Sequence, residues 1–297
     1  MRLLLRGLAG MPLWMLYGVG AVIYFVAYYI LRWHRPLAAR NLANAFPEKS
    51  ERERAGILKQ SYRNLGETLG EAFWGFNAPS EELRRRVVIE NREIVLKYAA
   101  ERRSVILLTA HVCNWEWLLQ AGGAELGFPI DVVYKPIRLA SVDDFFREAR
   151  SRFGGKPITI DRFVFELMRR SGEARAYALV ADQTPPRSAA KHWSWFLNQD
   201  TAFFTGADKI AQFLDGPVVY VAMRRVRRGH YTARLHVLAE PPYDAEPNPP
   251  VMERYARKLE EEIRANPADW LWVHNKWKYP KPPAESVEVA RTAQAEP

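Results

Sequence analysis

One histidine and one glutamate carry the chemistry that this sequence most clearly predicts. His111 directly follows the apolar run 104–110, and Glu116 lies five residues further on. An imidazole takes a proton from a hydroxyl most effectively when a carboxylate fixes its tautomer and stabilises the imidazolium. We therefore predict that His111 is a general base oriented by Glu116, and that a substrate hydroxyl, not a protein side chain, is the nucleophile.

Other interpretations of these residues stay open at this point. A histidine at a strand end can simply bond a backbone carbonyl in the core. Cys113 paired with His111 would be a covalent catalyst, but a lone cysteine is more often a small buried hydrophobe. Metal binding by His111, Glu116 and His192 has no supporting spacing. We accordingly expect neither a metal nor another cofactor.

The elements that must position His111 alternate between strands and helices. The sequence predicts strands at 87–89, 104–110, 130–134, 158–160, 176–181, 218–224 and 232–239. It predicts helices at 92–103, 114–126, 141–153, 163–170, 206–214 and 251–265, with a polar and aromatic loop at 182–205. This alternation is typical of an α/β fold with a central, mostly parallel mixed sheet flanked by helices.

Several polar side chains follow the predicted strands. Ligands of such sheets gather at the carboxyl ends of the strands. Asp182 and Gln183 come directly after one strand, so we expect them at the same edge as His111. Arg150, Arg152 and Arg162 are candidates for contacts with a phosphate or an oxyanion, because guanidinium binds both in a bidentate manner. The structural alternative for Asp182 and Gln183 is a hydrogen-bonded turn, and that for Arg150 and Arg152 is a solvated helix end.

The N-terminus has the pattern of a membrane anchor. Residues 11–31 contain no charged side chain, and a helix needs roughly 20 apolar residues to span a bilayer. Aromatic residues lie near both ends of this stretch, and arginines follow it at once. We predict a transmembrane helix within a 1–40 anchor. A signal peptide would need a cleavage site that is not evident here, whereas a helix lying in the interface remains an alternative.

Composition limits the remaining possibilities. The 297 residues carry a net charge of +9, which suits anionic partners such as phospholipid head groups or an acidic carrier protein. We find no nucleic-acid recognition motif. The single cysteine excludes an intrachain disulfide and fits a reducing compartment. We expect one domain at 41–280 facing the cytoplasm, followed by a disordered tail at 281–297.

Seven short segments, in order, carry a family resemblance. They lie at 41–47, 109–116, 133–136, 160–162, 181–183, 203–206 and 270–278. Together they resemble the bacterial lipid A lauroyl/myristoyl acyltransferase family, within the wider lysophospholipid acyltransferase class. The 109–116 segment is similar to the family's His-x4-Asp/Glu motif. The chain departs from the pattern at Lys135 and Asn275, where arginine is usual.

The resemblance implies an inner-membrane enzyme whose catalytic domain faces the cytoplasm. It would move an acyl chain from acyl-acyl carrier protein to a hydroxyl of a lipid A precursor or a related phosphoglycolipid. His111 and Glu116 would be catalytic, and Lys135, Arg162, Asp182 and Gln183 would lie in the matching substrate segments. Backbone amides near Asn114, at a helix start, or a nearby arginine could stabilise the oxyanion.

Three alternatives to this activity differ in substrate or in class. The acceptor could be another glycolipid or a lysophospholipid, and the donor could be acyl-CoA. Glycerol-phosphate and lysophosphatidic acid acyltransferases usually show Asn-His and Phe-Pro-Glu-Gly-Thr segments, and this chain has neither. A membrane-tethered lipid-binding protein without activity would not need both His111 and Glu116.

Overall fold

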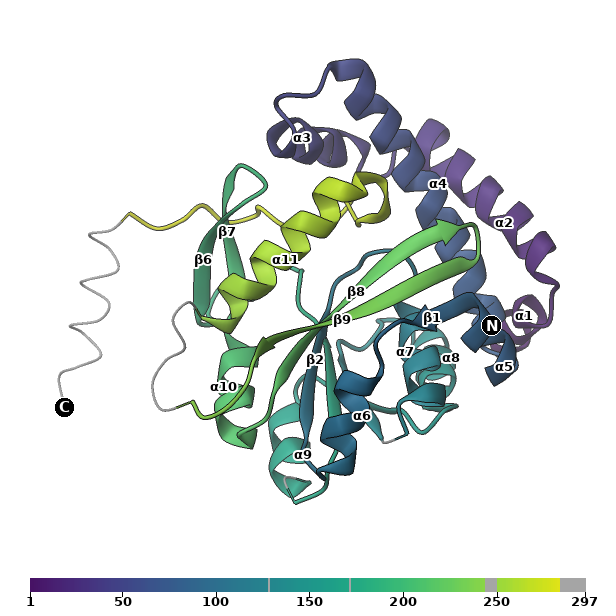
Figure 1. The fold of residues 1–297 in the computed structure, drawn as a ribbon. Helices are drawn as coiled ribbons and strands as arrows, with labels where there is room; N and C mark the ends of the chain where they lie inside the picture. Colours follow the sequence, from purple (N-terminus) through teal and green to yellow (C-terminus); the bar gives the residue numbers. More distant parts are fainter. Residues whose placement is uncertain (128, 171, 244–249, 284–297) are drawn as a thin grey trace.

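A mixed seven-stranded sheet forms the centre of the protein. The computed structural model describes residues 1–127, 129–170, 172–243 and 250–283. The strand order is β1-β9-β8-β2-β5-β3-β4, and every neighbouring pair is parallel except β8 and β9 (Figure 1). The strands are β1 Val87–Ile89, β2 Val105–Thr109, β3 Ile130–Tyr134, β4 Lys156–Thr159, β5 Ala176–Val180, β8 Val218–Arg227 and β9 His230–Ala239. The predicted α/β class is confirmed.

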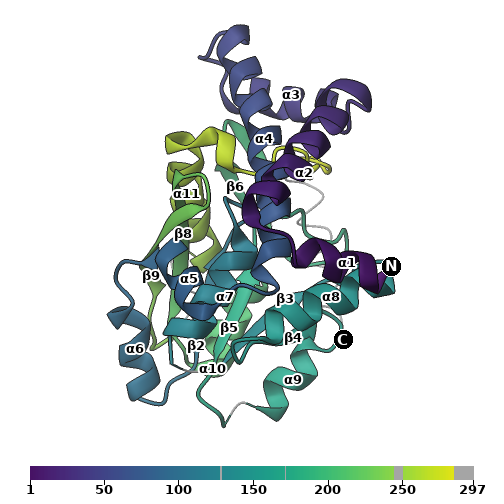
Figure 2. The ribbon, with the colours of Figure 1, turned by 90° about the vertical axis from the view of Figure 1, so that its right-hand side faces the viewer.

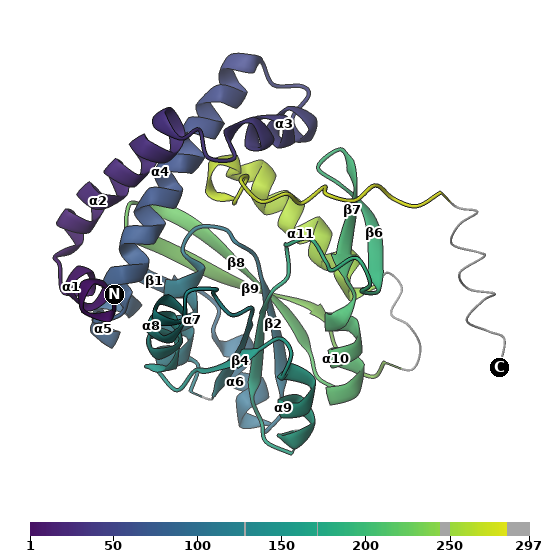
Figure 3. The same ribbon diagram turned by 180° about the vertical axis from the view of Figure 1, so that it is seen from behind.

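Helices cover the sheet and extend beyond it. They are α1 Arg2–Ala9, α2 Leu13–Phe25, α3 Arg35–Ala45, α4 Glu51–Gly75, α5 Ser80–Arg86, α6 Glu93–Ala100, α7 Trp115–Glu125, α8 Ala140–Ser151, α9 Phe163–Arg169, α10 Gly206–Leu214 and α11 Val251–Ala265. A π-helical turn, Val26–Ile30, continues α2, and a 3-10 turn, Pro267–Asp269, follows α11. Figures 1 and 3 show α2 lying alongside α4, and Figure 2 shows α1 beside α8.

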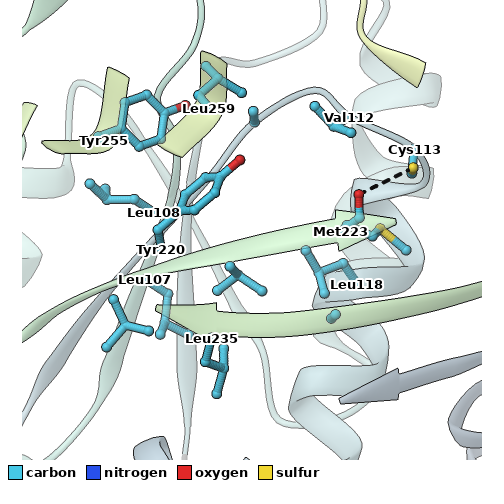
Figure 4. Packing of buried hydrophobic residues seen from close by; sticks show 14 of the residues in the cluster. Leu107, Leu108, Val112, Cys113, Leu118, Tyr220, Met223, Leu235, Tyr255 and Leu259 are labelled. Carbon is cyan, nitrogen blue, oxygen red and sulfur yellow. Dashed lines mark hydrogen bonds between the residues drawn. The ribbon is translucent and has the colours of Figure 1, made fainter. Parts of the chain in front are cut away.

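The central strand β2 is buried because helices cover both faces of the sheet. Four of its residues, Val105 to Leu108, are buried. Leu108 lies near Tyr220 of β8 and Tyr255 of α11, whereas Leu107, which points to the opposite face, lies nearer Leu235 of β9 (Figure 4). Such double-sided burial is expected of parallel strands and explains the uninterrupted apolar run in the sequence. The strand therefore holds the residues that follow it in a fixed place.

The structure corrects the predicted 182–205 loop. It contains an antiparallel hairpin, β6 Lys191–Phe196 and β7 Gln199–Phe204. The turn between them is Leu197-Asn198, and both residues have positive φ, 49° and 61°. Hairpin turns of this kind are normally signalled by Asn-Gly or Asp-Gly. Leucine in the first position hid the hairpin from sequence analysis.

Two helix starts show where cap signals succeed and fail. In the sequence, Ser50 with Glu53 three residues later predicts a capping box, and Ser141 with Asp144 three residues later predicts the cap of the 141–153 helix. The predicted capping box of Ser50 and Glu53 is present at the start of α4. The predicted cap by Ser141 is wrong, because α8 begins one residue earlier, at Ala140, with Leu139 in the cap position. Asp143 instead accepts a hydrogen bond from the backbone N–H of Ile137, at 2.7 Å. This bond shapes the loop before the helix.

The predicted domain division, 1–40, 41–280 and 281–297, stays a prediction. Leu13–Ile30 is a helical stretch of 18 residues whose length and composition suffice to cross a membrane. Most of the predicted disordered tail, 284–297, lies outside the described residues.

Candidate active site

His111 and Asp182 meet because their strands are neighbours. In the parallel pair of β2 and β5, Thr109 lies opposite Val180. His111 and Asp182 each come two residues after these partners, at the carboxyl ends of the strands. The Nδ1 atom of His111 lies 2.7 Å from Oδ1 of Asp182. The predicted edge of the sheet thus holds a histidine-carboxylate pair.

Asp182 is buried and ionised. Its side chain is 4% exposed, and its second oxygen, Oδ2, accepts a hydrogen bond from Nε1 of Trp270 at 2.9 Å. Burial alone would raise the pKa of this carboxyl, but the charge and hydrogen bond of His111, with the Trp270 bond, lower it to about 2. At neutral pH Asp182 is therefore an anion that can only accept hydrogen bonds.

The tautomer of His111 follows from this charge. Since Asp182 only accepts, Nδ1 donates and Nε2 of the neutral ring keeps its lone pair. The amide Nε2 of Gln183 lies 3.3 Å from that lone-pair nitrogen and can donate to it. Trp115 packs its ring edge-on to the imidazole, with centroids 4.9 Å apart. The bond from Nδ1 to Asp182 thus fixes the orientation of the imidazole, and Nε2 is the nitrogen that can accept a proton.

Glu116 does not make the contact that the sequence led us to expect. Its carboxylate pairs with the guanidinium of Arg150 on α8, at 2.9 Å from Nε and 2.5 Å from Nη2. The cause is the start of α7 at Trp115, which places Glu116 in the first helical turn and directs its side chain towards α8. The orienting contact belongs to Asp182 instead, while a catalytic role for Glu116 remains a prediction.

The turn between β2 and α7 is held by a carboxylate that sequence analysis missed. Cys113 has a positive φ of 54°, and Asn114 caps α7 by accepting from the backbone N–H of Trp117. The amide of Asn114 donates to Oε2 of Glu71 on α4 at 2.7 Å. Burial raises the pKa of Glu71 despite hydrogen bonds from its neighbours. An asparagine at a helix start was the available signal for the cap, but nothing in the sequence indicated its partner on α4.

The C-terminal segment encloses the loop that carries Asp182. His274 Nε2 accepts from the backbone N–H of Thr184 at 3.0 Å. Lys276 is buried and donates to the carbonyls of Gln183 and Ala202, at 3.3 Å and 2.9 Å. Burial lowers the pKa of Lys276 to about 7 and that of His274 to about 4. The 270–278 segment, one of the seven that carry the family resemblance, therefore holds the Asp182 loop in place.

The remaining predicted residues lie outside this cluster. Arg152 donates to the carbonyls of Gly75 and Ala78, at 2.7 Å and 2.9 Å, and so ties the end of α8 to the turn after α4. Lys135 and Arg162 are exposed, after β3 and at the start of α9. Neither forms a hydrogen bond with His111 within the described part of the chain. Arg150 contacts Glu116, as stated above.

The interior around His111 has little open space. Its side chain is 17% exposed. A cavity of about 20 Å³, lined in part by Thr68, Trp115 and Arg225, adjoins the imidazole. A space of this size holds a single water molecule. Burial raises the pKa of Cys113 well above its usual value, so its thiol stays neutral. Within the described residues no cluster of His, Cys, Asp and Glu could hold a metal ion.

The α/β fold and the histidine–carboxylate pair at the edge of its sheet fit the acyltransferase activity that the sequence predicts, and the family match below shows it. The family model for bacterial lipid A biosynthesis acyltransferases matches residues 2–279. The chain belongs to this family, and the resemblance found in its sequence is confirmed.

Curated relatives are similar over most of their length. A lipid A biosynthesis palmitoleoyltransferase of Escherichia coli K12 is 25% identical over 258 residues, which cover 84% of this chain and 80% of the relative. A lipid A biosynthesis lauroyltransferase of the same strain is 24% identical over 276 residues, 90% and 87% of the two chains. A lipid A biosynthesis acyltransferase of Haemophilus influenzae is 24% identical over 249 residues, 80% and 74% of the two chains.

Proposed function

We propose that the protein transfers a fatty acyl chain from acyl-acyl carrier protein to a hydroxyl of a lipid A precursor or a related phosphoglycolipid. One observation carries the mechanism: His111 Nδ1 lies 2.7 Å from a buried, ionised Asp182. This contact leaves Nε2 free to act as the general base, with Asp182 stabilising the imidazolium that forms.

The proposed reaction has two steps. Nε2 of His111 removes the proton from the acceptor hydroxyl, and the hydroxyl oxygen attacks the carbonyl carbon of the thioester. The tetrahedral oxyanion then collapses, the carbon–sulfur bond breaks, and the imidazolium returns its proton to the departing thiolate. The products are an ester and a carrier protein with a free thiol. Backbone N–H groups at the positive end of α7 are our candidates for stabilising the oxyanion.

Gln183 must move for this reaction to start. Its amide lies 3.3 Å from the proposed base atom, where the acceptor hydroxyl has to bind. Gln183 is exposed, so its side chain can turn away into solvent without losing buried packing. We propose that the acceptor hydroxyl displaces this amide and that Gln183 then binds the acceptor.

The remaining site residues are proposed to position the reactants. Arg150 and Glu116 form a nearly buried pair that joins α8 to the first turn of α7. We propose that this pair fixes the helix start that faces the oxyanion. Lys135, Arg152 and Arg162 would contact phosphates of the acceptor. All three are exposed and form no ion pair within the described residues, although Arg152 already donates to two backbone carbonyls.

The substrates and the location are inferred from the relatives and from charge. The names of the relatives specify palmitoleoyl and lauroyl transfer in lipid A biosynthesis. A net charge of +9 favours an acidic carrier protein and a phosphorylated acceptor. We propose that the catalytic domain faces the cytoplasm at the bacterial inner membrane. Transfer from acyl-CoA, or to another glycolipid or a lysophospholipid, is the alternative.

The test uses the purified full-length protein with carrier-protein and coenzyme A thioesters of one acyl chain. The product is identified by mass spectrometry of the acylated acceptor. We expect transfer from the carrier protein, and a loss of at least about 1,000-fold in His111→Ala, because general-base catalysis and its orientation are removed together. Wild-type rates in His111→Ala would overturn the mechanism. Lipid binding with no transfer to any acceptor would instead favour the non-catalytic alternative.

A further inference from the structure

Helix α2 packs closely against α4, with backbone in contact with backbone. A Cβ atom added to Gly20 would lie 2.4 Å from the carbonyl oxygen of Gly66, and one added to Gly66 would lie equally close to that of Gly20. A Cβ on Gly70 would lie 2.7 Å from the carbonyl oxygen of Leu16. Glycine at these positions lets the two backbones touch. The apolar N-terminal helix is therefore part of the folded domain.

Charged side chains of other elements contact α2 at Tyr17 and at Tyr24. The hydroxyl of Tyr17 donates to Glu71 at 3.0 Å, and Arg228 lies over the Tyr17 ring at 5.1 Å. Further along the helix, Arg63 lies 5.4 Å from the Tyr24 ring.

The same pattern continues past the end of α2, into the π-helical turn. There Lys59 lies 5.9 Å from the ring of Tyr29. From Tyr17 to Tyr29 a helix rises about 18 Å. More than half the thickness of a bilayer's hydrocarbon core, which is about 30 Å, thus lies beside charged groups of the domain.

The outward face of the same helix carries no charge at all. Its exposed apolar side chains are Trp14, Met15, Val22, Ile23, Phe25 and Ile30. Helix α1, which precedes it, exposes Leu3 and Leu4, while its Arg2 and Arg6 pair with Asp144 and Glu148 of α8. A face this apolar on the outside of a domain marks a membrane or protein interaction site. Beside this apolar face, Arg32 and Arg63 are exposed and form no ion pair among the described residues. Apolar and uncompensated basic side chains side by side favour an anionic lipid surface.

The face of α2 that packs on α4 lies beside charged groups, and the opposite face is apolar and exposed. A helix that crosses the membrane would place both faces in the hydrocarbon core. A crossing α2 would carry Lys59 and Arg63 of α4 into the hydrocarbon core, where charged groups are costly. Leaving α4 behind would open the glycine contact and break the bond between Tyr17 and Glu71. We propose that α1 and α2 lie in the plane of one leaflet, with the exposed apolar face inserted among lipids and the domain resting on the head groups.

The first test is the side of the membrane on which the N-terminus lies. Single cysteines are introduced by Arg2→Cys and, as the control on the domain surface, Arg169→Cys. The natural Cys113 is buried and stays unlabelled. Spheroplasts producing the full chain are treated with a membrane-impermeant maleimide, before and after lysis. We expect both cysteines to behave alike and to be labelled only after lysis.

The outcomes separate this proposal from the proposed function. Labelling of Arg2→Cys alone in intact spheroplasts means that α2 crosses the bilayer and overturns the inference. Labelling of both cysteines in intact spheroplasts supports the in-plane arrangement but contradicts the cytoplasmic location of the enzyme. Recovery of the protein in the soluble fraction, or as a dimer that shields both helices, overturns the lipid partner.

The second test measures depth along α2. Nitroxide labels are attached to Trp14→Cys, Val22→Cys and Ile30→Cys in the full chain, reconstituted in phosphatidylethanolamine–phosphatidylglycerol vesicles. Collision with oxygen and with a water-soluble nickel complex gives the depth of each label. We expect three similar, shallow depths of about 5–10 Å. A label at Val22 near the bilayer centre, with shallow labels at both other positions, would show a crossing helix.

Discussion

At the scale of single residues, the sequence placed His111 at the correct edge of the sheet but gave it the wrong carboxylate partner. His111, Asp182 and Gln183 were all expected at the carboxyl edge of the sheet, since each follows a strand. The sequence could not show that β2 and β5 are neighbours, and it is this neighbourhood that brings Asp182 to Nδ1 of His111. Proximity along the chain made Glu116 the natural partner, but the geometry of the first helical turn directs its carboxylate to Arg150.

Asp182→Asn tests the orientation of the base. The amide can donate as well as accept, so Nδ1 of His111 is no longer held as the donor and the lone pair at Nε2 is lost in part of the molecules. We expect kcat to fall by about 10³–10⁴-fold, by analogy with the same change in a serine-protease triad, while KM changes little. Steady-state kinetics of transfer measure both. Asp200→Asn, an exposed carboxylate paired with Lys281, is the matched control and should retain full activity.

The lowered pKa of Asp182 also predicts how the free energy of unfolding changes with pH. The pKa of Asp182 is lowered from 3.8 to about 2 in the folded protein, so its ionised form is favoured by folding. This contribution is fully present above about pH 4 and is lost as pH falls through 2; it amounts to roughly 2 kcal/mol. Urea unfolding at several pH values measures it. Asp182→Asn should lose less free energy of unfolding than the wild type between pH 4 and 2, and equal losses would refute the assignment.

Substitutions of Glu116 and Arg150 test whether this ion pair only stabilises the fold or also supports acyl transfer. Removing one member of a nearly buried ion pair leaves the other charge uncompensated, at a cost of about 3–5 kcal/mol. We expect Glu116→Gln and Arg150→Met each to destabilise the protein, and the double variant to be more stable than the sum of the two changes predicts. If the pair positions the site, transfer stays low in the double variant although its stability recovers. Recovery of both would leave the pair a purely structural role.

At the scale of elements, sequence patterns predicted the regular core well and its irregular contacts poorly. Strand β3 and helices α10 and α11 have the predicted bounds, because apolar periodicity and helix starts are local properties. The β6–β7 hairpin was missed because Leu197 occupies a turn position that usually requires glycine or asparagine. The packing of α2 on α4 was equally hidden, since three isolated glycines in two separate helices give no signal that they face one another.

Gly66→Ala and Gly56→Ala test the contact between α2 and α4 on the same helix. A Cβ at position 66 meets the backbone of Gly20 at 2.4 Å, whereas one at position 56 meets nothing within 4 Å. We expect Gly66→Ala to destabilise the protein by about 1–3 kcal/mol through overpacking. Gly56→Ala should leave it unchanged or stabilise it by up to about 1 kcal/mol, because alanine favours helices. Thermal unfolding in detergent compares the two, and equal melting temperatures would show that α2 does not pack on α4.

At the scale of the whole molecule, the active site depends on both ends of the described chain. Asn41, on α3, donates to the carbonyls of Trp272 and His274, at 3.1 Å each. Trp270 in that segment bonds Asp182. A chain of contacts therefore runs from the N-terminal helices through the C-terminal segment to the pair of His111 and Asp182. The sequence showed both segments as parts of one family pattern, but not that they touch, because their residues lie more than 200 positions apart.

Asn41→Leu tests whether this long-range connection matters for catalysis. Leucine has a similar volume but no donor, so two carbonyls inside the fold lose their partner, which costs about 2–3 kcal/mol. Because the segment 270–276 then opens more often, Trp270 holds Asp182 for a smaller fraction of the time. We expect kcat to fall several-fold with KM unchanged, and hydrogen exchange to accelerate in this segment and not in β2. Asn44→Leu, on the same helix and exposed, removes only a bond to Gln199 and should change neither measurement. Faster exchange in the segment at an unchanged kcat would show that the C-terminal segment supports the fold without positioning the base.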